Sequence, residues 1–133
     1  MSEEPVYNVL GDRVRVLASG EGSAFEMFEW QGPENSGPPP HMHPWTESYF
    51  VIEGEADVVI GEKSLRATPG CFVSVPPGTL HSYRVTTPGA KFLVVTNPSG
   101  LKAFVEDLHD VADLETVMKV AAKHSVTVPP PPA

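Results

Sequence analysis

The sequence has little of several features that define whole classes of protein. It contains one cysteine, Cys71, among 133 residues, so no disulfide can form within the chain, which agrees with a reducing compartment. No run of about 18 apolar residues occurs, so we expect no membrane-spanning helix and no membrane partner. The first five residues are acidic where a signal peptide would be basic and then apolar. The prediction is a cytoplasmic protein.

Positive charge is scarce as well. Nine lysines and arginines stand against 17 aspartates and glutamates, which gives a formal net charge of −8. A protein of this sign repels a phosphate backbone, so we exclude nucleic acid as a partner. The length suits a single domain with one hydrophobic core.

Proline and glycine, by contrast, are abundant, with 15 and 11 residues, and they separate short runs of strand-forming residues. Turn signals recur every 8–12 residues or so, a spacing typical of an antiparallel sandwich or barrel rather than of βαβ units. The sequence therefore predicts an all-β body. The predicted strands span residues 13–17, 24–30, 41–43, 47–52, 56–60, 63–67, 72–75, 81–86 and 92–96.

The pattern changes to helical after Pro98. Ser99 is the predicted N-cap of a first helix, and Asp113 is the predicted N-cap of a second. We expect both helices to cover an open edge or mouth of the barrel. Their apolar faces consist of Leu101, Phe104, Val105 and Leu108 in the first helix, and Leu114, Val117, Met118 and Ala121 in the second.

Three histidines and a glutamate form the candidate functional site. His41 and His43 are two residues apart, so they project from the same face of an extended strand. Glu47 opens the next strand and faces the same interior if the two strands pair. The turn residues 77–78 place His81 at the start of a later strand. Three imidazoles and one carboxylate form a ligand set for a divalent transition metal.

Such a set occupies four positions of an octahedron and leaves two open. The open positions can take a small-molecule substrate, or a substrate together with O2. These ligands accept Fe, Mn, Ni, Zn, Co or Cu, one ion per chain, and do not select among them. A lone histidine on a strand is usually a core residue. Here three of the five histidines in the chain belong to the one candidate site, which favours metal binding.

The two motifs resemble those of the cupin superfamily. Its first motif reads His-x-His, three residues, Glu, six residues, Gly, and is matched by His41, His43, Glu47 and Gly54. Its second motif reads Gly, five residues, Pro-x-Gly, two residues, His, and is matched by Gly70, Pro76, Gly78 and His81. This chain departs from the pattern at Asn35, where the family usually has glycine, and at Val85, where it has asparagine.

The resemblance implies an all-β fold, a cupin jelly-roll β-barrel with two short C-terminal helices. The expected organisation is an N-terminal arm at 1–12, the barrel at 13–98, the helices at 99–124 packed on the barrel, and a proline-rich tail at 125–133. Apolar residues on both faces of 24–30 predict that a second sheet or subunit covers this strand, and we expect a homodimer.

Two tyrosines are candidates for a catalytic role beside Glu47. Tyr49 shares the face of Glu47, and Tyr83 shares the face of His81. Either phenol can donate a hydrogen bond to a substrate or a bound oxygen species, although packing in the barrel core explains both equally well. Glu47 itself can accept a proton from a substrate hydroxyl, provided that its environment raises its pKa.

Residues 37–108 are similar to the quercetin dioxygenase-like branch of small cupins. The similarity implies a dioxygenase-type oxidoreductase that acts on an enol-containing or phenolic small molecule. Two alternatives stay open. One is non-redox catalysis by the metal as a Lewis acid, in an isomerase or a polyketide-type cyclase. The other is a cupin that binds a small molecule without turnover, because one fold hosts many functions.

Overall fold

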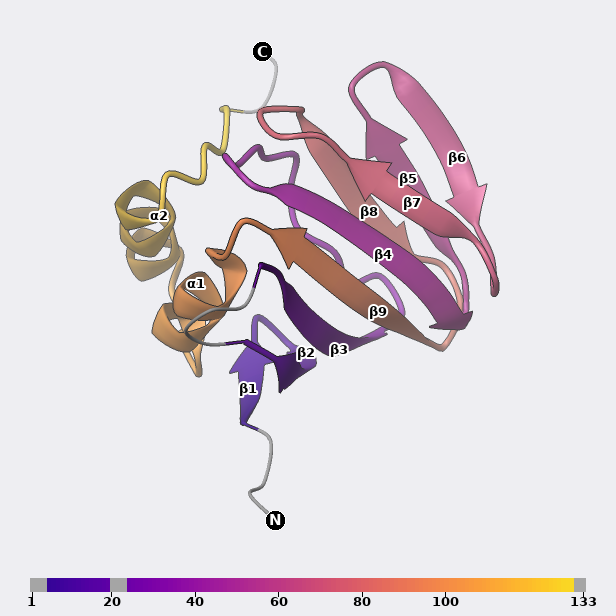
Figure 1. Ribbon diagram of the computed structural model, residues 1–133, viewed down its shortest axis with the longest axis horizontal. Coiled ribbons are helices and arrows are strands. Elements are labelled where there is room, and N and C mark those ends of the chain that lie inside the picture. The colour runs from indigo at the N-terminus through magenta and orange to yellow at the C-terminus, as the bar shows by residue number, and fades with distance from the viewer. Residues whose placement is uncertain (1–4, 20–23, 131–133) are drawn as a thin grey trace.

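Two antiparallel β-sheets face each other in the computed structural model, which describes residues 5–19 and 24–130 (Figure 1). The larger sheet has the strand order β1-β2-β3-β9-β4-β7, and the smaller one has the order β6-β5-β8. The strands are β1 (Val6–Val9), β2 (Asp12–Ala18), β3 (Glu26–Pro33), β4 (Thr46–Glu53), β5 (Ala56–Ile60), β6 (Lys63–Ala67), β7 (Phe72–Val75), β8 (His81–Val85) and β9 (Gly89–Asn97). The predicted β-rich fold with two C-terminal helices is confirmed.

The core lies between the two sheets, where alternate residues of each strand point inward. Val14, Phe28 and Val51 from the larger sheet and Val58 and Val85 from the smaller one are almost fully buried. Each buried side chain of this kind contributes about 1.5–3 kcal/mol relative to an exposed one. The alternation that predicted the strands therefore also decides which face of each sheet is inside.

The histidine segment forms less regular structure than predicted. Residues 41–43 do not make a continuous strand, because His41 pairs with His81 in one isolated bridge and Met42 pairs with Thr127 in another. The loop before them runs very close to β8. Gly37 has φ +148°, and a Cβ atom there would collide with the Tyr83 carbonyl oxygen. Glycine at this position therefore lets the loop approach the strand that carries His81.

Helix α1 (Leu101–Leu108) is not capped as the sequence predicts. Its N-cap is Gly100 and not Ser99, and glycine has no side chain that could cap the helix. Instead the Glu26 carboxylate of β3 accepts hydrogen bonds from the backbone N–H groups of Gly100, Leu101 and Lys102. A negative charge at this end also suits the helix dipole. A residue far away in the sequence thus fixes the start of α1.

Helix α2 (Leu114–Lys123) begins as predicted, because the Asp113 side chain accepts a hydrogen bond of 2.9 Å from the Thr116 N–H. At its other end, Lys123 and His124 both contact the Asp107 carboxylate of α1. The chain then returns to the barrel, where Thr127 exchanges two backbone hydrogen bonds with Met42. Residues 126–128 therefore lie beside the histidine segment.

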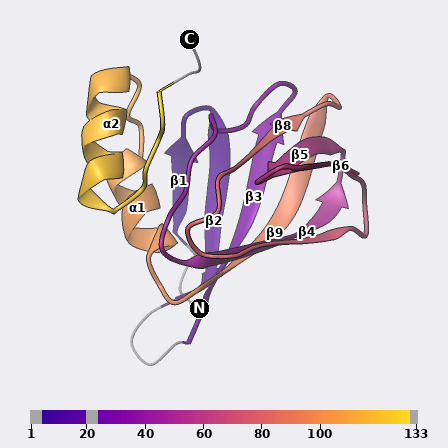
Figure 2. The same ribbon diagram turned by 90° about the horizontal axis from the view of Figure 1, so that it is seen from above.

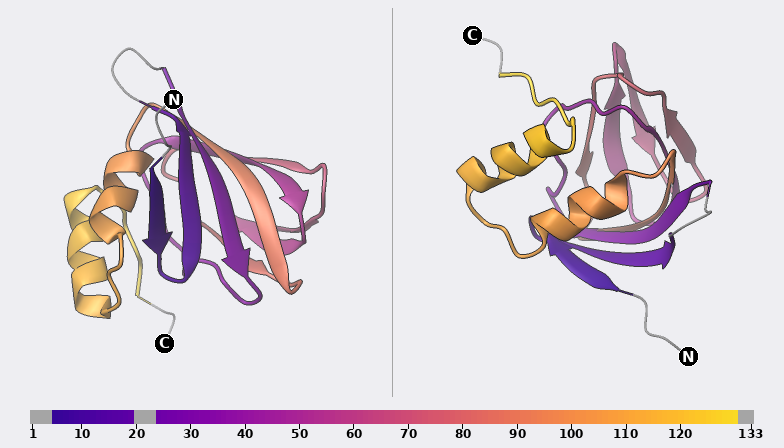
Figure 3. Two further views of the ribbon diagram at one scale, coloured as in Figure 1. Left: turned by 90° about the horizontal axis from the view of Figure 1, so that it is seen from below. Right: turned by 60° about the vertical axis from the view of Figure 1, so that its left-hand side comes forward.

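The two helices lie side by side at one end of the barrel (Figures 2 and 3). Side chains of both helices line the cavity described below, which agrees with the predicted cover over the mouth. Within the described residues, no helix is long and apolar enough to span a membrane. Of the predicted proline-rich tail, residues 131–133 lie outside the described part of the chain, as do residues 1–4 of the predicted arm.

Candidate metal centre

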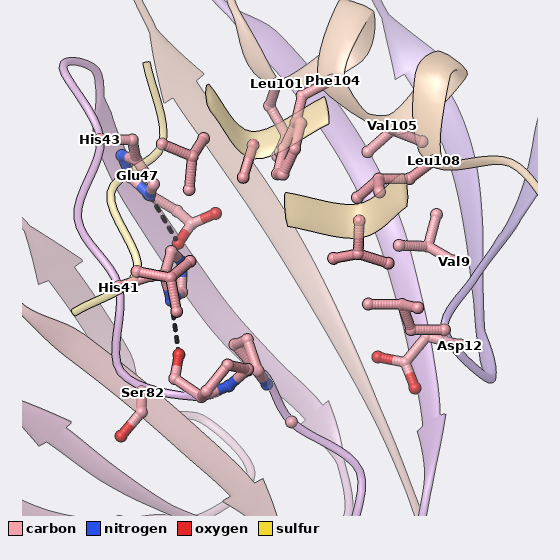
Figure 4. A pocket seen from close by; sticks show the side chains of 18 of the residues that line it. Val9, Asp12, His41, His43, Glu47, Ser82, Leu101, Phe104, Val105 and Leu108 are labelled. Carbon is pink, nitrogen blue, oxygen red and sulfur yellow. Dashed lines mark hydrogen bonds and ion pairs between the residues drawn. The ribbon is translucent and has the colours of Figure 1, made fainter. Parts of the chain in front are cut away.

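The structure brings the four sequence-predicted ligands together. The ligand nitrogens of His41, His43 and His81 lie within 4.8 Å of one another. Glu47 Oε2 is 3.3 Å from His81 Nε2 and 3.7 Å from His43 Nε2. Figure 4 shows His41, His43 and Glu47 grouped on one side of a cavity. His43 and His81 are buried, with 4% and 3% of their surfaces exposed, which leaves His41 and the cavity as the open side of the group.

Strand pairing explains why residues so distant in sequence converge. His41 and His81 are directly opposite in an antiparallel bridge, with backbone N–H···O distances of 3.0 and 2.9 Å. Directly opposite residues project from the same face, so both rings enter the interior. Glu47 lies on β4, where inward positions alternate with outward ones, and its register partner on β9 is the buried Thr96.

Each of the three imidazoles has one nitrogen committed to a backbone carbonyl. The Nδ1 atoms of His41, His43 and His81 lie 3.0, 3.0 and 2.8 Å from carbonyl oxygens two residues away. A carbonyl only accepts, so in each pair Nδ1 carries the proton and donates it. In a neutral ring the lone pair is then on Nε2, which is the tautomer that a metal ligand needs. In His81, Nε2 also lies 3.3 Å from the Glu47 carboxylate, which only accepts, so without a metal a proton links these two side chains. With all three Nδ1 atoms committed to carbonyls, the Nε2 atoms are the positions that a metal would take.

The polar inventory of the site also fits a bound cation. His43 Nε2 is buried and has no hydrogen-bond partner in the described structure. A buried polar atom without a partner carries an energetic cost that a coordinated ion would remove. Nitrogen ligands with one carboxylate are the donors that first-row divalent metals accept. The residues present therefore fit the metal that the sequence predicts.

The charge states of His41 and Glu47 agree with this assignment, whereas at His81 burial is outweighed by the contacts with Glu47 and Thr79, which raise the pKa of that ring, so a metal there must displace a proton. Burial lowers the pKa of His41 to about 4, and the neighbouring His81 adds to the effect, so this ring is neutral near pH 7. Burial alone would raise the pKa of Glu47, but its interactions with His43 and His81 prevail and lower it to about 2. Metal ligands bind in their deprotonated forms. A lowered pKa favours Glu47 as a ligand over Glu47 as a proton acceptor, which needs the opposite shift.

A cavity of about 370 Å³ opens from the histidine cluster toward the C-terminal helices. This volume is in the range of small-molecule sites, roughly 300–1,000 Å³. Tyr49, Tyr83 and Phe92 line it, with ring centroids 5.5–6.2 Å apart. Most other lining side chains are apolar, and no lysine or arginine of the described chain is among them. The cavity therefore suits an apolar ligand that has a polar group at the cluster.

The two tyrosines differ in what their hydroxyls contact. The Tyr49 hydroxyl has no hydrogen-bond partner among the described residues, whereas the Tyr83 hydroxyl donates to Asp12 Oδ2 at 3.5 Å. Burial raises the pKa of both phenols, so both keep their protons at neutral pH. Tyr49 thus has a free donor at the cavity. The catalytic roles of Glu47, Tyr49 and Tyr83 stay predictions.

Asp12 is a cavity residue that sequence reasoning missed. It lies at the first position of β2, 7% exposed, and its Oδ2 accepts a hydrogen bond of 2.8 Å from the Trp30 indole. Its Oδ1 is buried without a partner. The strand alternation could have indicated it. Val14 and Val16 point inward, and Asp12, two residues before Val14, lies on the same face.

Two facing antiparallel sheets around a cluster of inward histidines define a small β-barrel of the cupin class. The model of the Cupin_2 cupin domain family matches residues 27–96, more than half of the chain. The protein therefore belongs to the cupin domain family, as its motifs predicted.

Individual relatives are distant. The chain is 28% identical over 104 residues to quercetin 2,3-dioxygenase of Bacillus subtilis, a match that covers 75% of this chain and 31% of the relative. It thus spans about a third of that protein's length. Among solved structures, it is similar to an RmlC-like cupin from Shewanella frigidimarina, with a TM-score of 0.66 and 18% identity over 72% of this chain and 85% of that one. It is also similar to the DMSP lyase DddQ from Ruegeria pomeroyi, with a TM-score of 0.57 and 26% identity over 65% of this chain and 46% of that one.

Proposed function

We propose that the protein is a metal-dependent enzyme, a dioxygenase-type oxidoreductase that acts on an enol-containing or phenolic small molecule. The observation that carries the proposal is the convergence of His41, His43 and His81, whose ligand nitrogens lie within 4.8 Å of one another and whose Nδ1 atoms all contact carbonyls, with Glu47 beside His43 and His81 at the wall of an apolar cavity. The similarity to quercetin 2,3-dioxygenase supports the choice of substrate class. The redox step is the part that rests on this distant similarity alone.

His41, His43, Glu47 and His81 would hold the metal, which would supply an acidic centre that binds oxygen donors at its open positions. The chain's own residues do the rest. The protonated Tyr49 hydroxyl donates a hydrogen bond to a substrate oxygen held near Glu47, and the apolar lining excludes water around it. Because no lysine or arginine is among the described residues that line the cavity, an anionic oxygen of the substrate would find its main positive charge at the metal.

Metal content and O2 consumption test the proposal together. We expect the protein from its own host to contain iron, manganese, nickel, cobalt or copper, and to consume O2 with a flavonol, a β-diketone or a catechol. His81→Ala should lose both the metal and the O2 uptake. His109→Ala is the matched control, because His109 lies on the surface and contacts β1 instead. Retention of metal by His81→Ala would contradict the ligand assignment.

A second candidate is non-redox metal catalysis, and the likeness to a DMSP lyase favours it, because a lyase needs no oxidant. In that case the same four residues hold the metal, which polarises a carbonyl or carboxylate of the substrate. Tightly held zinc without O2 uptake would favour this reading. If the protein contains no metal and binds none that is added, the result would instead favour a cupin that binds a small molecule without turnover.

Homodimerisation and a cytoplasmic location stay predictions. The outer face of the larger sheet carries Phe50 and Phe72, which are cross-strand neighbours and are 41% and 67% exposed. We propose that a second copy of the chain covers this face. Light scattering should then give twice the monomer mass, and Phe72→Ser should lower it.

A further inference from the structure

We propose that helix α2 is the specificity-determining wall of the cavity, and that the substrate is a molecule with an oxygen-chelating head and an apolar body. The head reaches the histidine cluster while the body packs on α2. This inference rests on the proposed function, since it takes the metal site as the place where the head binds.

The apolar face of α2 is shared between the hydrophobic core and the cavity, because Ala121 belongs to the core and Val117 packs against it, whereas Leu114 and Met118 are exposed. Leu114, Val117, Met118 and Ala121 follow helical spacing on one face, and all four line the cavity. A helix normally buries such a stripe against protein. Here Ala121 is buried, but Leu114 is 74% exposed and Met118 is 40% exposed. The first half of the stripe therefore lacks a protein partner where the cavity begins.

Helix α1 forms another wall of the same cavity but is firmly fixed. Its Leu101, Val105 and Leu108 are buried, and its first turn is held by Glu26. The side-chain hydrogen bonds of α2 to the rest of the described chain lie at its C-terminal end, where Lys123 and the C-cap His124 contact Asp107 of α1. One wall is thus rigid, whereas the N-terminal half of the other can adjust to what lies against it.

The cavity is continuous from the histidines to the helices. Figure 4 shows His41, His43 and Glu47 on one side and the α1 residues Leu101, Phe104, Val105 and Leu108 across from them. A ligand whose oxygen atoms are at the cluster can extend only into space lined mainly by apolar side chains. Burial of a charged or strongly polar body there would be costly. Contact with the α2 stripe would instead remove apolar surface of both ligand and helix from water.

Two β-diketones that share one head and differ in their bodies test the inference. Acetylacetone carries two methyl groups, and dibenzoylmethane carries two phenyl groups. The protein is loaded with Co(II), whose visible absorption reports ligand binding, and the ratio of the two dissociation constants is measured. Intrinsic differences between the chelators cancel when this ratio is compared between variants.

The test variant is Leu114→Ser combined with Met118→Ser, two exposed positions whose change should leave the fold intact. Leu65→Ser is the matched control, because Leu65 is 39% exposed on β6 and does not line the cavity. We expect the preference for dibenzoylmethane to fall roughly tenfold in the double variant, as for loss of apolar pocket contacts, and to stay unchanged in the control. In the unmutated protein, amide exchange of residues 114–123 should slow with dibenzoylmethane and not with acetylacetone.

Three results would overturn the inference in distinguishable ways. Equal ratios in the double variant and the unmutated protein, with no protection of α2, would remove α2 from specificity and leave the metal site in place. Absence of any spectral change with either diketone would overturn the proposed function and the inference with it. Conversion of a dimer to a monomer by the double variant would show that a second copy of the chain covers the stripe.

Discussion

Two glutamates of the larger sheet, one buried and one largely buried, face the same interior from the same row, yet their surroundings differ. Glu26 on β3 and Glu47 on β4 both pair in register with Thr96 of β9, which lies between them. Glu26 Oε1 accepts hydrogen bonds from the Thr96 hydroxyl and from three backbone N–H groups at the start of α1, at 3.0–3.2 Å. Glu47 has two imidazoles beside it and accepts from no backbone N–H group of the described residues.

The comparison shows that the partners of a buried carboxylate, and not its burial, indicate its role. Glu26 is satisfied by donors that the chain itself supplies, so it anchors a helix. Glu47 instead faces the Nε2 atoms of His43 and His81, whose Nδ1 atoms contact carbonyls, so the carboxylate and the two rings can share a bound cation. Substitutions at the two positions should therefore affect different properties, stability at Glu26 and metal affinity at Glu47.

The largest effect is expected from Glu26→Ala. It removes the common acceptor of four donors and leaves the first turn of α1 without a cap, so we expect a loss of about 3 kcal/mol in unfolding free energy. Urea unfolding of the metal-free protein measures it. Glu106→Ala is the control on α1 itself, because its pair with Lys102 is exposed and should contribute less than about 0.5 kcal/mol. Equal effects of the two changes would contradict the anchoring role.

Glu47→Gln should act mainly on metal binding. Loss of the one charged candidate ligand should weaken Co(II) or Zn(II) binding at least tenfold, equivalent to about 1.4 kcal/mol. The metal-free protein should also lose some unfolding free energy at neutral pH, because the lowered pKa of Glu47 means that its charged form stabilises the fold. Calorimetric titration gives the affinity. Glu53→Gln serves as the control because Glu53 is on the same strand but exposed. Unchanged affinity in Glu47→Gln would leave a site of three histidines only.

The sequence predicted that Glu47 belongs to the candidate site but did not predict that Glu26 caps α1, and the reason is physical. The candidate ligands His41, His43 and Glu47 lie within one short motif, so their spacing and strand phase already indicate a common face. Glu26 acts on residues about 75 positions away, and only the pairing of β3 with β9 brings them together. Local rules therefore selected Ser99 as the cap of α1, because a distant carboxylate is invisible to them.

Irregular pairing limited the prediction in the same way. The boundaries of the other predicted strands matched within a few residues, since turn residues mark them, but β1 (Val6–Val9) lies inside the segment predicted as an N-terminal arm. The segment at 41–43 was predicted as a strand, but its two bridges go to different partners, His81 and Thr127. The second partner follows both helices, so its return to the barrel depends on how α1 and α2 pack and not on its own sequence.

Thr96→Val sharpens the comparison with a smaller effect. Thr96 is the register neighbour of both glutamates, but its hydroxyl donates to Glu26 alone, at 3.0 Å. Valine keeps the shape and removes the donor, so we expect a loss of about 1 kcal/mol in unfolding free energy and no change in metal affinity. Urea unfolding and metal titration of the same sample separate the two. A change in metal affinity would mean that Thr96 also positions Glu47.

Asp12 is a third buried carboxylate, intermediate between the other two, and the smallest effect is expected there. Its Oδ2 accepts from Trp30 and Tyr83, but its Oδ1, near the Ser36 hydroxyl, has no partner. Burial raises the pKa of this carboxyl above its ordinary value of 3.8, although the hydrogen bonds oppose the shift. The native state then binds more protons than the unfolded state just above pH 3.8, so the Asp12 contribution makes stability fall as pH rises through that window.

Asp12→Asn removes this dependence, because asparagine does not ionise. Its amide oxygen can keep the bond from Trp30, and its NH2 group can donate to Ser36 in place of the orphaned oxygen. We therefore expect a small gain in unfolding free energy at pH 7 that shrinks as the pH falls toward 3.8, measured by urea unfolding across that range. A variant less stable than the unmutated protein at pH 7 would mean that the Asp12 charge is satisfied, which would place this residue with Glu26 and leave Glu47 as the one carboxylate of the three that depends on a bound cation.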